Sequence, residues 1–269
     1  MDAIILPAET DQNRTVLQSA AALEAAGEKF VMVTVIRTQG RTPRNTGAKL
    51  IWRPDTPAIG TIGGGAVEEL VFDEAAKHYE MRGCGTSSHI LGQEAEQCCG
   101  GRMEFFYEYF GPTHRLVIFG AGHVAHALVG VLSGLRFEIV IVDDRPQWNC
   151  LARFPQCKRI LNFDEGLSCV DAHADQTCVC IMTYSHETDF DILSKLLEKP
   201  PLYTGLIGSQ SKRACFVGRL MAQGFSEAQI ESMTCPMGLG RGGKHPRAVA
   251  ISIASELLHI TGEAHAGRA

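Results

Sequence analysis

A glycine-rich segment in the middle of the chain has the clearest chemical signature. Residues 115–119 form a short apolar run, and Gly120-Ala-Gly122-His-Val-Ala125 follows with the spacing Gly-x-Gly-x-x-Ala. A second apolar run ends on Asp143, about twenty residues after the glycines, where the acid of a dinucleotide-binding turn is expected. In such a turn, backbone amides hold a pyrophosphate at a helix start and the acid accepts ribose hydroxyls. The order of strand, glycines, helix and acid therefore predicts a nucleotide-type ligand.

The residues around this loop leave the identity of the ligand open. Gly120 permits the tight turn, and Gly122 lets a phosphate approach the backbone. His123 either faces an acidic ligand group or lies on the surface. Asp143 favours the ribose of NAD, whereas the nearby Arg145 is compatible with a phosphate on that ribose. A domain of this type that has lost its ligand is the alternative.

A second cluster follows a later apolar strand, in the sequence Thr183-Tyr-Ser-His186-Glu-Thr-Asp189. Ligands of open α/β sheets bind at the carboxyl ends of the strands, so we expect His186 and Asp189 to lie at or near the site. Asp189, three residues after His186, is expected to orient its imidazole. The alternative is a helix capped by Ser185 or Thr188, with acids in its first turn.

Two further segments are suited to anions. Ile207-Gly-Ser209-Gln-Ser-Lys212-Arg213 follows the next strand and combines hydroxyls with two cations at a helix start. A plain capped helix is the alternative there. Residues 235–247 suit an anionic ligand or a protein surface but lack the spacing of a Walker loop. Their basic-capable side chains lie among glycines and are Arg241, Lys244, His245 and Arg247.

Three clusters precede the central glycines. They are Thr42-Pro-Arg44, the glycine-rich run 60–65 with Glu68, and Cys98-Cys99-Gly-Gly. Gly63-Gly64-Gly65 at a helix start is expected to accept an anion on bare amides, although flexible glycines also simply make turns. Cys99 is either an accessible soft ligand or sulfur acceptor, or a buried structural thiol.

Composition restricts the class of protein. The 269 residues suit two domains of ordinary size. A net charge of −5 and a pI near 6.1 argue against a nucleic-acid partner, which needs a basic excess. The ten cysteines include no Cys-x-x-Cys, and Cys178 and Cys180 in an apolar run are typical of buried thiols. Neither a signal peptide nor a membrane span is evident, so we expect a reducing cytoplasm.

The apolar periodicity predicts two domains. Residues 1–111 are expected to form an α+β domain, with helices at 11–26 and 66–81 and strands at 30–36, 49–52 and 102–110. Residues 112–269 alternate strands with helices, which is typical of a Rossmann-like, doubly wound parallel sheet. Gly111-Pro112 is the expected linker. The strands of the second domain are expected near 115–119, 138–142, 158–161, 177–183 and 202–207, and its last helix at 248–259.

Seven segments, in the same order, resemble the motifs of the xanthine dehydrogenase accessory proteins, the XdhC/CoxI family. The resemblance covers nearly the whole chain, from Val16 to Ile260. Two local departures are Arg41, where the family usually has Ser, and Gly243-Lys244-x-Pro246, which is closer to the branch that serves xanthine dehydrogenase itself. The seven motifs are Gly40-Arg-Thr-Pro-Arg44-Asn-Thr-Gly-Ala-Lys49, Gly60-Thr-Ile-Gly-Gly-Gly65, Cys98-Cys99-Gly-Gly101, Gly120-Ala-Gly-His-Val124, Ser185-His186-Glu187-x-Asp189, Gly205-Leu-Ile-Gly-Ser209-x-x-Lys212-Arg213 and Pro236-Met-Gly-Leu239.

The resemblance implies a protein that handles the molybdenum cofactor. Members of this family bind the molybdenum–pterin cofactor (molybdopterin), protect it, support its sulfuration by a cysteine desulfurase and hand it to the apo-hydroxylase. We therefore expect a cytoplasmic maturation factor and not an enzyme, homodimeric, with the molybdenum subunit of xanthine dehydrogenase as its client. Cys99 is also the candidate metal ligand. The residues expected to bind the cofactor are Arg44, Gly63, Gly64, Gly65, Cys99, Gly120, Gly122, His123, Asp143, His186, Ser209 and Lys212.

Two functions of other classes remain as alternatives. An NAD(P)-dependent oxidoreductase would use Asp143 on the ribose and His186 as its acid or base, but no second catalytic group accompanies them. A pure scaffold would keep an empty Rossmann domain. Binding of a nicotinamide cofactor would indicate the oxidoreductase. For the scaffold, Gly122→Asp should leave activation of the client unchanged.

Overall fold

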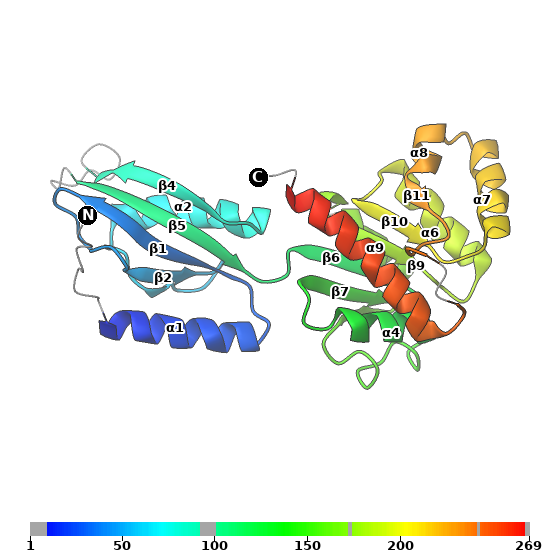
Figure 1. Ribbon diagram of the computed structural model, residues 1–269, viewed down its shortest axis with the longest axis horizontal. Coiled ribbons are helices and arrows are strands. Elements are labelled where there is room, and N and C mark those ends of the chain that lie inside the picture. Colours follow the sequence, from blue (N-terminus) through cyan, green and yellow to red (C-terminus); the bar gives the residue numbers. More distant parts are fainter. Residues whose placement is uncertain (1–9, 92–100, 172–173, 241–242, 267–269) are drawn as a thin grey trace. The chain divides into compact units, whose positions relative to one another are not determined.

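Two sheets, one antiparallel and one parallel, organise the chain (Figure 1). The computed structural model describes residues 10–91, 101–171, 174–240 and 243–266. It divides the chain into one unit at Met1–Pro112 and a second at Thr113–Ala269. Each unit has its own buried core.

The first unit is an antiparallel sheet with a helix on each face. In spatial order its strands are β3 (Ile59–Gly60), β2 (Lys49–Trp52), β1 (Phe30–Gln39), β5 (Arg102–Phe110) and β4 (Gly85–Ile90). Side chains alternate between the two faces of a strand. Val31 and Val33 of β1 therefore pack with α2 (Ala66–Met81), while Phe30 and Met32 pack with α1 (Thr10–Ala25).

The sequence analysis missed two strands of this unit, the two-residue β3 and the longer β4. The sequence of β4, Gly-Thr-Ser-Ser-His-Ile, lacks the alternation of apolar and polar residues that indicates a half-buried strand. It pairs with β5 at the edge of the sheet, and its residues alternate between half-buried and exposed. Pairing with a strong neighbour therefore overrides a weak local preference.

The second unit is a six-stranded parallel sheet of the Rossmann type. In spatial order its strands are β11 (Met233–Thr234), β10 (Tyr203–Leu206), β9 (Thr177–Ile181), β6 (His114–Phe119), β7 (Phe137–Val142) and β8 (Lys158–Ile160). Every pairing in it is parallel. The predicted combination of an α+β part and a Rossmann-like doubly wound sheet is thus confirmed, although the short β11 was not expected. Cys178 and Cys180 are buried in β9, as predicted.

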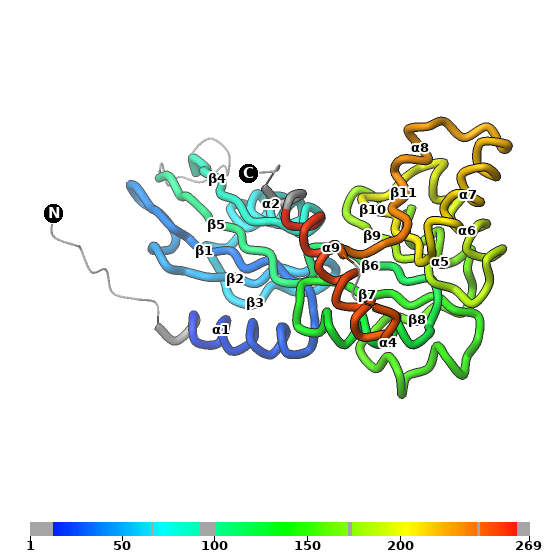
Figure 2. Tube along the Cα trace, turned by 45° about the vertical axis from the view of Figure 1, so that its right-hand side comes forward, coloured from blue at the N-terminus to red at the C-terminus, as the bar shows by residue number. Residues whose placement is uncertain are grey.

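Helices cover both faces of the parallel sheet. On one face α4 (His123–Leu132) and α9 (Pro246–Ala266) lie side by side (Figure 2), against a core that includes Leu116 and Ile118. The other face packs on α5 (Phe163–Asp171), α6 (His186–Glu198) and α7 (Gln210–Ala222), with α8 (Glu227–Glu231) beside α6. A 3₁₀ turn, Ala174–Gln176, leads into β9. Within the described residues no helix is long and apolar enough to cross a membrane.

Candidate functional site at the switch point of the parallel sheet

The glycine loop lies where the strand order of the parallel sheet reverses. From β6 the chain proceeds to β7 and β8 on one side, and then to β9 and β10 on the other. Ligands of open α/β sheets bind at such a switch point, outside the carboxyl ends of the strands. Gly120 follows β6 there, and its amide donates to the carbonyl of Val142 over 2.7 Å. The amide of Met182, after β9, donates to the carbonyl of Phe119 over 2.8 Å.

Only glycine fits the first position of the loop. Gly120 has φ 111°, a conformation that L-residues rarely adopt, and a Cβ atom there would overlap the carbonyl of Met182. Gly122 is the N-cap of α4. Unlike Gly120, it has room for a side chain, because a Cβ atom there would meet nothing within 4 Å. The cap has no side-chain hydrogen bond. The start of α4 is therefore open on the side of Gly122.

His123 is exposed at the first position of α4. Its ring meets the ring of Trp148 edge to face, with centroids 5.3 Å apart. Trp148 belongs to the irregular segment after β7, which the sequence analysis did not consider. The imidazole is thus placed beside the open start of the helix, and a role as a ligand contact stays a prediction.

Asp143 has a structural role that its position in the sequence did not indicate. Its side chain is completely buried, and Oδ2 accepts from the amide of Ala121 over 2.7 Å. The guanidinium of Arg145 donates to both carboxylate oxygens, from Nε over 2.8 Å and from Nη2 over 2.6 Å. Burial alone raises the pKa of Asp143, but the hydrogen bonds from Arg145 and Ala121 outweigh it and lower this pKa below its ordinary value. The carboxylate therefore anchors the glycine loop to the end of β7.

Aromatic rings hold the guanidinium of Arg145 in place. Its central carbon lies 4.2 Å from the ring centroid of Tyr184 and 5.3 Å from that of Trp148. The hydroxyl of Tyr184 donates to Oδ2 of Asp144 over 3.1 Å. Tyr184 comes from the segment after β9, so these contacts join the ends of strands on both sides of the glycine loop.

Arg153 is a residue at the loop that sequence reasoning missed. Its Nη1 atom donates to the carbonyl of Ala121 over 2.8 Å, and its Nη2 atom donates to that of Gly122 over 3.3 Å. The guanidinium also lies 4.7 Å from the ring centroid of Trp148. No local pattern marks Arg153, because it lies in the irregular segment after β7, far along the chain from the glycines. It places a positive charge beside the start of α4.

His186 and Asp189 do not form the pair that was expected. Oδ1 of Asp189 accepts from the hydroxyl of Thr183 over 2.7 Å, and Oδ2 accepts from Nζ of Lys212 over 2.6 Å. The carboxylate thus faces Thr183 and Lys212 and does not orient the imidazole of His186, which is exposed in the first turn of α6. The capping alternative is confirmed, since Ser185 accepts from the amide of Thr188.

Ser209 and Lys212 are engaged within the unit. Ser209 caps α7, and its hydroxyl accepts from the amide of Lys212 over 3.2 Å. Nζ of Lys212 donates to Asp189 and to the carbonyl of Ile207, and the side chain is only 8% exposed. The expected open anion cradle is therefore a capped helix with an internal ion pair, and anion binding by these two residues stays a prediction.

Two of the predicted clusters of the first unit, the loop of Arg44 and the glycine run, meet at one end of its sheet. A Cβ atom on Gly63 would overlap the ring of Pro43, and one on Gly101 would overlap the backbone of Arg41. The loop at 40–47 therefore touches both the glycine run and Gly101. Arg44 is half-buried in that loop, and its carbonyl accepts from the hydroxyl of Thr42. Cys98 and Cys99 lie outside the described residues, as does Arg241.

The amides of the glycine run are not bare, contrary to expectation. Oε1 of Glu68 accepts from the hydroxyl of Thr61 over 2.6 Å and from the amides of Ile62 and Gly64 over 3.3 and 3.1 Å. The amide of Gly63 donates to the hydroxyl of Thr61. A carboxylate of the chain itself thus occupies the place of an anion at the start of α2. Cofactor binding by Gly63, Gly64 and Gly65 stays a prediction.

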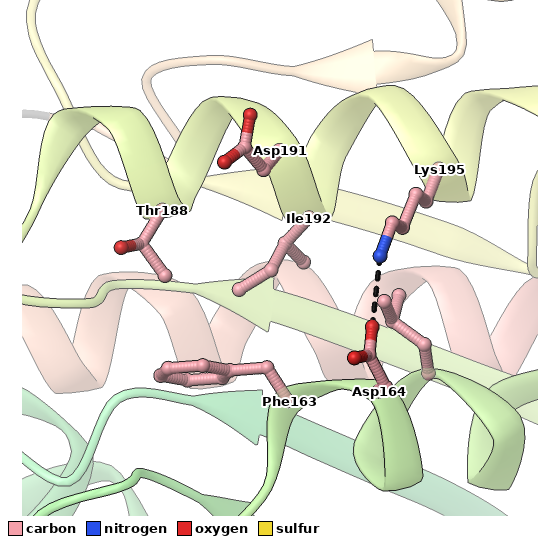
Figure 3. Close-up of a pocket in the computed structure, with 7 residues that line it drawn as sticks. Phe163, Asp164, Thr188, Asp191, Ile192 and Lys195 are labelled. Atoms are coloured by element: carbon pink, nitrogen blue, oxygen red, sulfur yellow. Dashed lines mark hydrogen bonds and ion pairs between the residues drawn. The ribbon is translucent and has the colours of Figure 1, made fainter.

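A surface groove of about 250 Å³ lies between α5 and α6 (Figure 3). Lys195 of α6 reaches across it to Asp164 of α5, with Nζ 2.8 Å from Oδ1, and both side chains are largely exposed. The groove contains none of the predicted site residues. Among the described residues no group of three or more His, Cys, Asp or Glu side chains could hold a metal ion.

Comparison with known proteins identifies both parts of the chain. Residues 116–257 match the XdhC Rossmann domain, and residues 23–86 match the XdhC and CoxI family. A solved structure described as a xanthine dehydrogenase from Bacillus halodurans shares the fold, with a TM-score of 0.51 and 21% identity over 93% of this chain and 96% of that one.

Three relatives align over most of the chain. YqeB of Escherichia coli K12, described as uncharacterized, is 29% identical over 94% of this chain, which spans only 47% of that longer protein. The molybdenum cofactor insertion chaperone PaoD, also of Escherichia coli K12, is 22% identical over 93% of this chain and 89% of its own. A protein of Bacillus subtilis 168, named as a probable xanthine dehydrogenase subunit, is 20% identical over 86% of this chain and 93% of its own. With a family model that matches more than half of its residues, and with the switch-point geometry of a Rossmann sheet, this chain belongs to the XdhC and CoxI family.

Proposed function

We propose that this chain is a maturation factor for a molybdenum enzyme, which binds the molybdenum–pterin cofactor as cargo and delivers it to an apo-xanthine dehydrogenase. The observation that most supports this proposal is the start of α4, which is open beside Gly122 and lies next to the guanidinium of Arg153. Backbone amides at a helix start and an adjacent arginine together attract a phosphate. The pterin cofactor carries such a phosphate, or the pyrophosphate of a dinucleotide.

The family relationship supports cargo handling over catalysis. PaoD, which aligns over most of both chains, is named as an insertion chaperone, and the Bacillus subtilis relative is named after xanthine dehydrogenase. A carrier needs a site that holds an anionic ligand and releases it, and an open helix start at the carboxyl ends of the strands suits this better than a closed pocket.

The proposal includes sulfuration of the cargo and three partners. A cysteine desulfurase would supply the sulfur, the molybdenum subunit of xanthine dehydrogenase would receive the cofactor, and a second copy of the chain would complete a homodimer in the cytoplasm. Cys99 is the proposed soft contact for molybdenum or sulfur. Cys99 itself lies outside the described residues, so its role rests on the family resemblance alone.

Retention of the cofactor tests the proposal. Purified chain, freed of small molecules, is mixed without oxygen with molybdopterin released from a denatured molybdoenzyme, and is then passed through an ultrafilter. We expect pterin and molybdenum to stay with the protein at about micromolar concentrations. The loaded protein should then activate cofactor-free xanthine dehydrogenase faster than the free cofactor does. Passage of all pterin through the filter would contradict the proposal.

An empty scaffold and a dehydrogenase predict other results. A scaffold would activate the client without retaining pterin. An NAD(P)-dependent oxidoreductase needs an acid that is available to the ribose, but the carboxylate of Asp143 is bonded to Arg145 and to the amide of Ala121. We therefore do not propose a nicotinamide-dependent activity.

A further inference from the structure

The acid that a nucleotide-binding turn uses for ribose is already bonded within this chain. Asp143 accepts from Nε and Nη2 of Arg145 and from the backbone amides of Ala121 and Arg145, over distances of 2.6–3.0 Å. The side chain has no exposed surface. A ribose hydroxyl could reach this carboxylate only by displacing the guanidinium.

The guanidinium is restrained from its other side as well. It lies 4.2 Å from the ring centroid of Tyr184 and 5.3 Å from that of Trp148. The hydroxyl of Tyr184 is itself bonded to Asp144. Displacement of Arg145 would therefore cost two charge-assisted hydrogen bonds and the contact with two aromatic rings.

We infer that Arg145 is a specificity-determining residue, which closes the Rossmann crevice to NAD(H) and to other nucleotides with free ribose hydroxyls. Neutral hydroxyls form weaker hydrogen bonds to a carboxylate than a guanidinium does, so the exchange is unfavourable. The ligand of the open helix start must then bind by its phosphate and without this acid. The inference concerns what the crevice rejects, so it holds whether or not the pterin cofactor is the cargo.

The variant Arg145→Ala should open the site. Asp143 keeps its two backbone donors in this variant, and the lone pairs that accepted from the guanidinium become available to a ribose hydroxyl. We expect NADH to bind roughly ten- to hundredfold more tightly than to the wild type, the range set by hydrogen bonds to a charged group. NADPH should gain nothing, because its ribose phosphate would meet the uncovered negative charge.

The experiment titrates NADH and NADPH into the full chain, with nicotinamide fluorescence and calorimetry as readouts. The protein is produced in a host that lacks pterin cofactor synthesis, so that no cargo occupies the crevice. We expect no saturation of the wild type below about 1 mM NADH. The double variant Asp143→Asn/Arg145→Ala should lose the gain in NADH affinity, because the carboxylate that Arg145→Ala uncovers is then absent.

Two results would overturn the inference. One is tight binding of NADH to the wild type, and the other is a folded Arg145→Ala variant whose affinity for NADH is unchanged. If Arg145→Ala fails to fold, Tyr184→Ala serves instead, because it leaves Asp143 paired and removes the ring beside the guanidinium together with the hydrogen bond to Asp144. That variant should show a smaller gain for NADH, and the absence of any gain would equally contradict the inference.

Discussion

The Nζ atom of Lys212 lies 2.6 Å from Oδ2 of Asp189, and the two side chains are only 8% and 2% exposed. The pair joins the start of α7 to the first turn of α6 at the carboxyl edge of the parallel sheet. Thr183, which follows β9, donates to the other oxygen of the same carboxylate. The edge that carries the candidate site is therefore held together by a buried ion pair.

Removing one partner of this pair should destabilise the protein strongly. Lys212→Met leaves the carboxylate of Asp189 buried without its cation, which costs about 3 kcal/mol or more of unfolding free energy. Urea unfolding of the wild type and the variant measures this. Asp189→Asn/Lys212→Met should recover part of the loss, because it removes the uncompensated charge.

The matched control is Lys195→Met, which breaks the exposed pair with Asp164. Its side chains are 57% and 79% exposed, so the change should stay within about 1 kcal/mol. Equal effects of the two lysine variants would show that the Lys212 pair is not buried in solution.

The lowered pKa of Asp143 predicts a loss of stability in acid. Because the folded-state pKa lies below the ordinary value of 3.8, the stabilisation is complete above that value and is lost as the pH falls towards the folded pKa. Arg145→Gln removes the main partner and should cost about 1–3 kcal/mol near neutral pH. The difference in unfolding free energy between the variant and the wild type should become smaller when urea unfolding is repeated from about pH 5 down to about pH 3. A difference that stays constant over this range would contradict the assignment.

The first unit offers a test at the glycine run. Glu68→Ala removes the acceptor of Thr61 and of two backbone amides, and should cost about 1–3 kcal/mol. Glu68→Gln keeps an acceptor oxygen and should cost less. Glu69→Ala is the control, because Glu69 also lies in the first turn of α2 and loses only its interaction with the helix dipole, about 0.3–1 kcal/mol. Chemical denaturation in a Trp148→Phe background, followed by the fluorescence of Trp52, would rank the three variants by their unfolding free energy. Equal losses for Glu68→Ala and Glu69→Ala would contradict the role of Glu68.

Much of the fold was predictable because strands such as β6 and β7 carry apolar runs and several helices begin after a glycine or a serine. The two-residue strands β3 and β11 were missed because they are too short to show a pattern, and β4 was missed because Gly85–Ile90 has no apolar pattern and pairs only at an edge. The glycine loop was equally readable, because the φ of Gly120 and its contact with Met182 demand glycine.

The side-chain partners at the site were not predictable in the same way. Arg153 and Tyr184 reach the loop from segments that are distant in the sequence and have no regular pattern. Sequence position suggested that Asp143 is available to a ligand and that the amide of Gly64 is bare. Only folding brings the guanidinium of Arg145 to the carboxylate of Asp143, and the carboxylate of Glu68 to the amide of Gly64.

The open position at Gly122 allows a test of cargo binding that spares the fold. Gly122 has φ −70° and ψ −168°, which any residue adopts, and a Cβ atom there would meet no neighbour within 4 Å. Asp is a favoured N-cap, so Gly122→Asp should keep the unfolding free energy or raise it by a few tenths of a kcal/mol. Its carboxylate should nevertheless repel a phosphate at the start of α4 and weaken retention of the pterin cofactor by roughly tenfold or more.

Gly122→Asn is the matched control, because it has the same shape and capping ability without the charge. Retention by ultrafiltration and client activation should both fall for Asp and change little for Asn. Equal retention by the two variants would show that no anionic group binds at the start of α4. Because we expect both variants to fold, a difference in cofactor retention between them measures the effect of one negative charge at position 122. The positive charge of Arg153 lies beside Gly122, so the wild-type loop should attract an anion that the Asp variant repels.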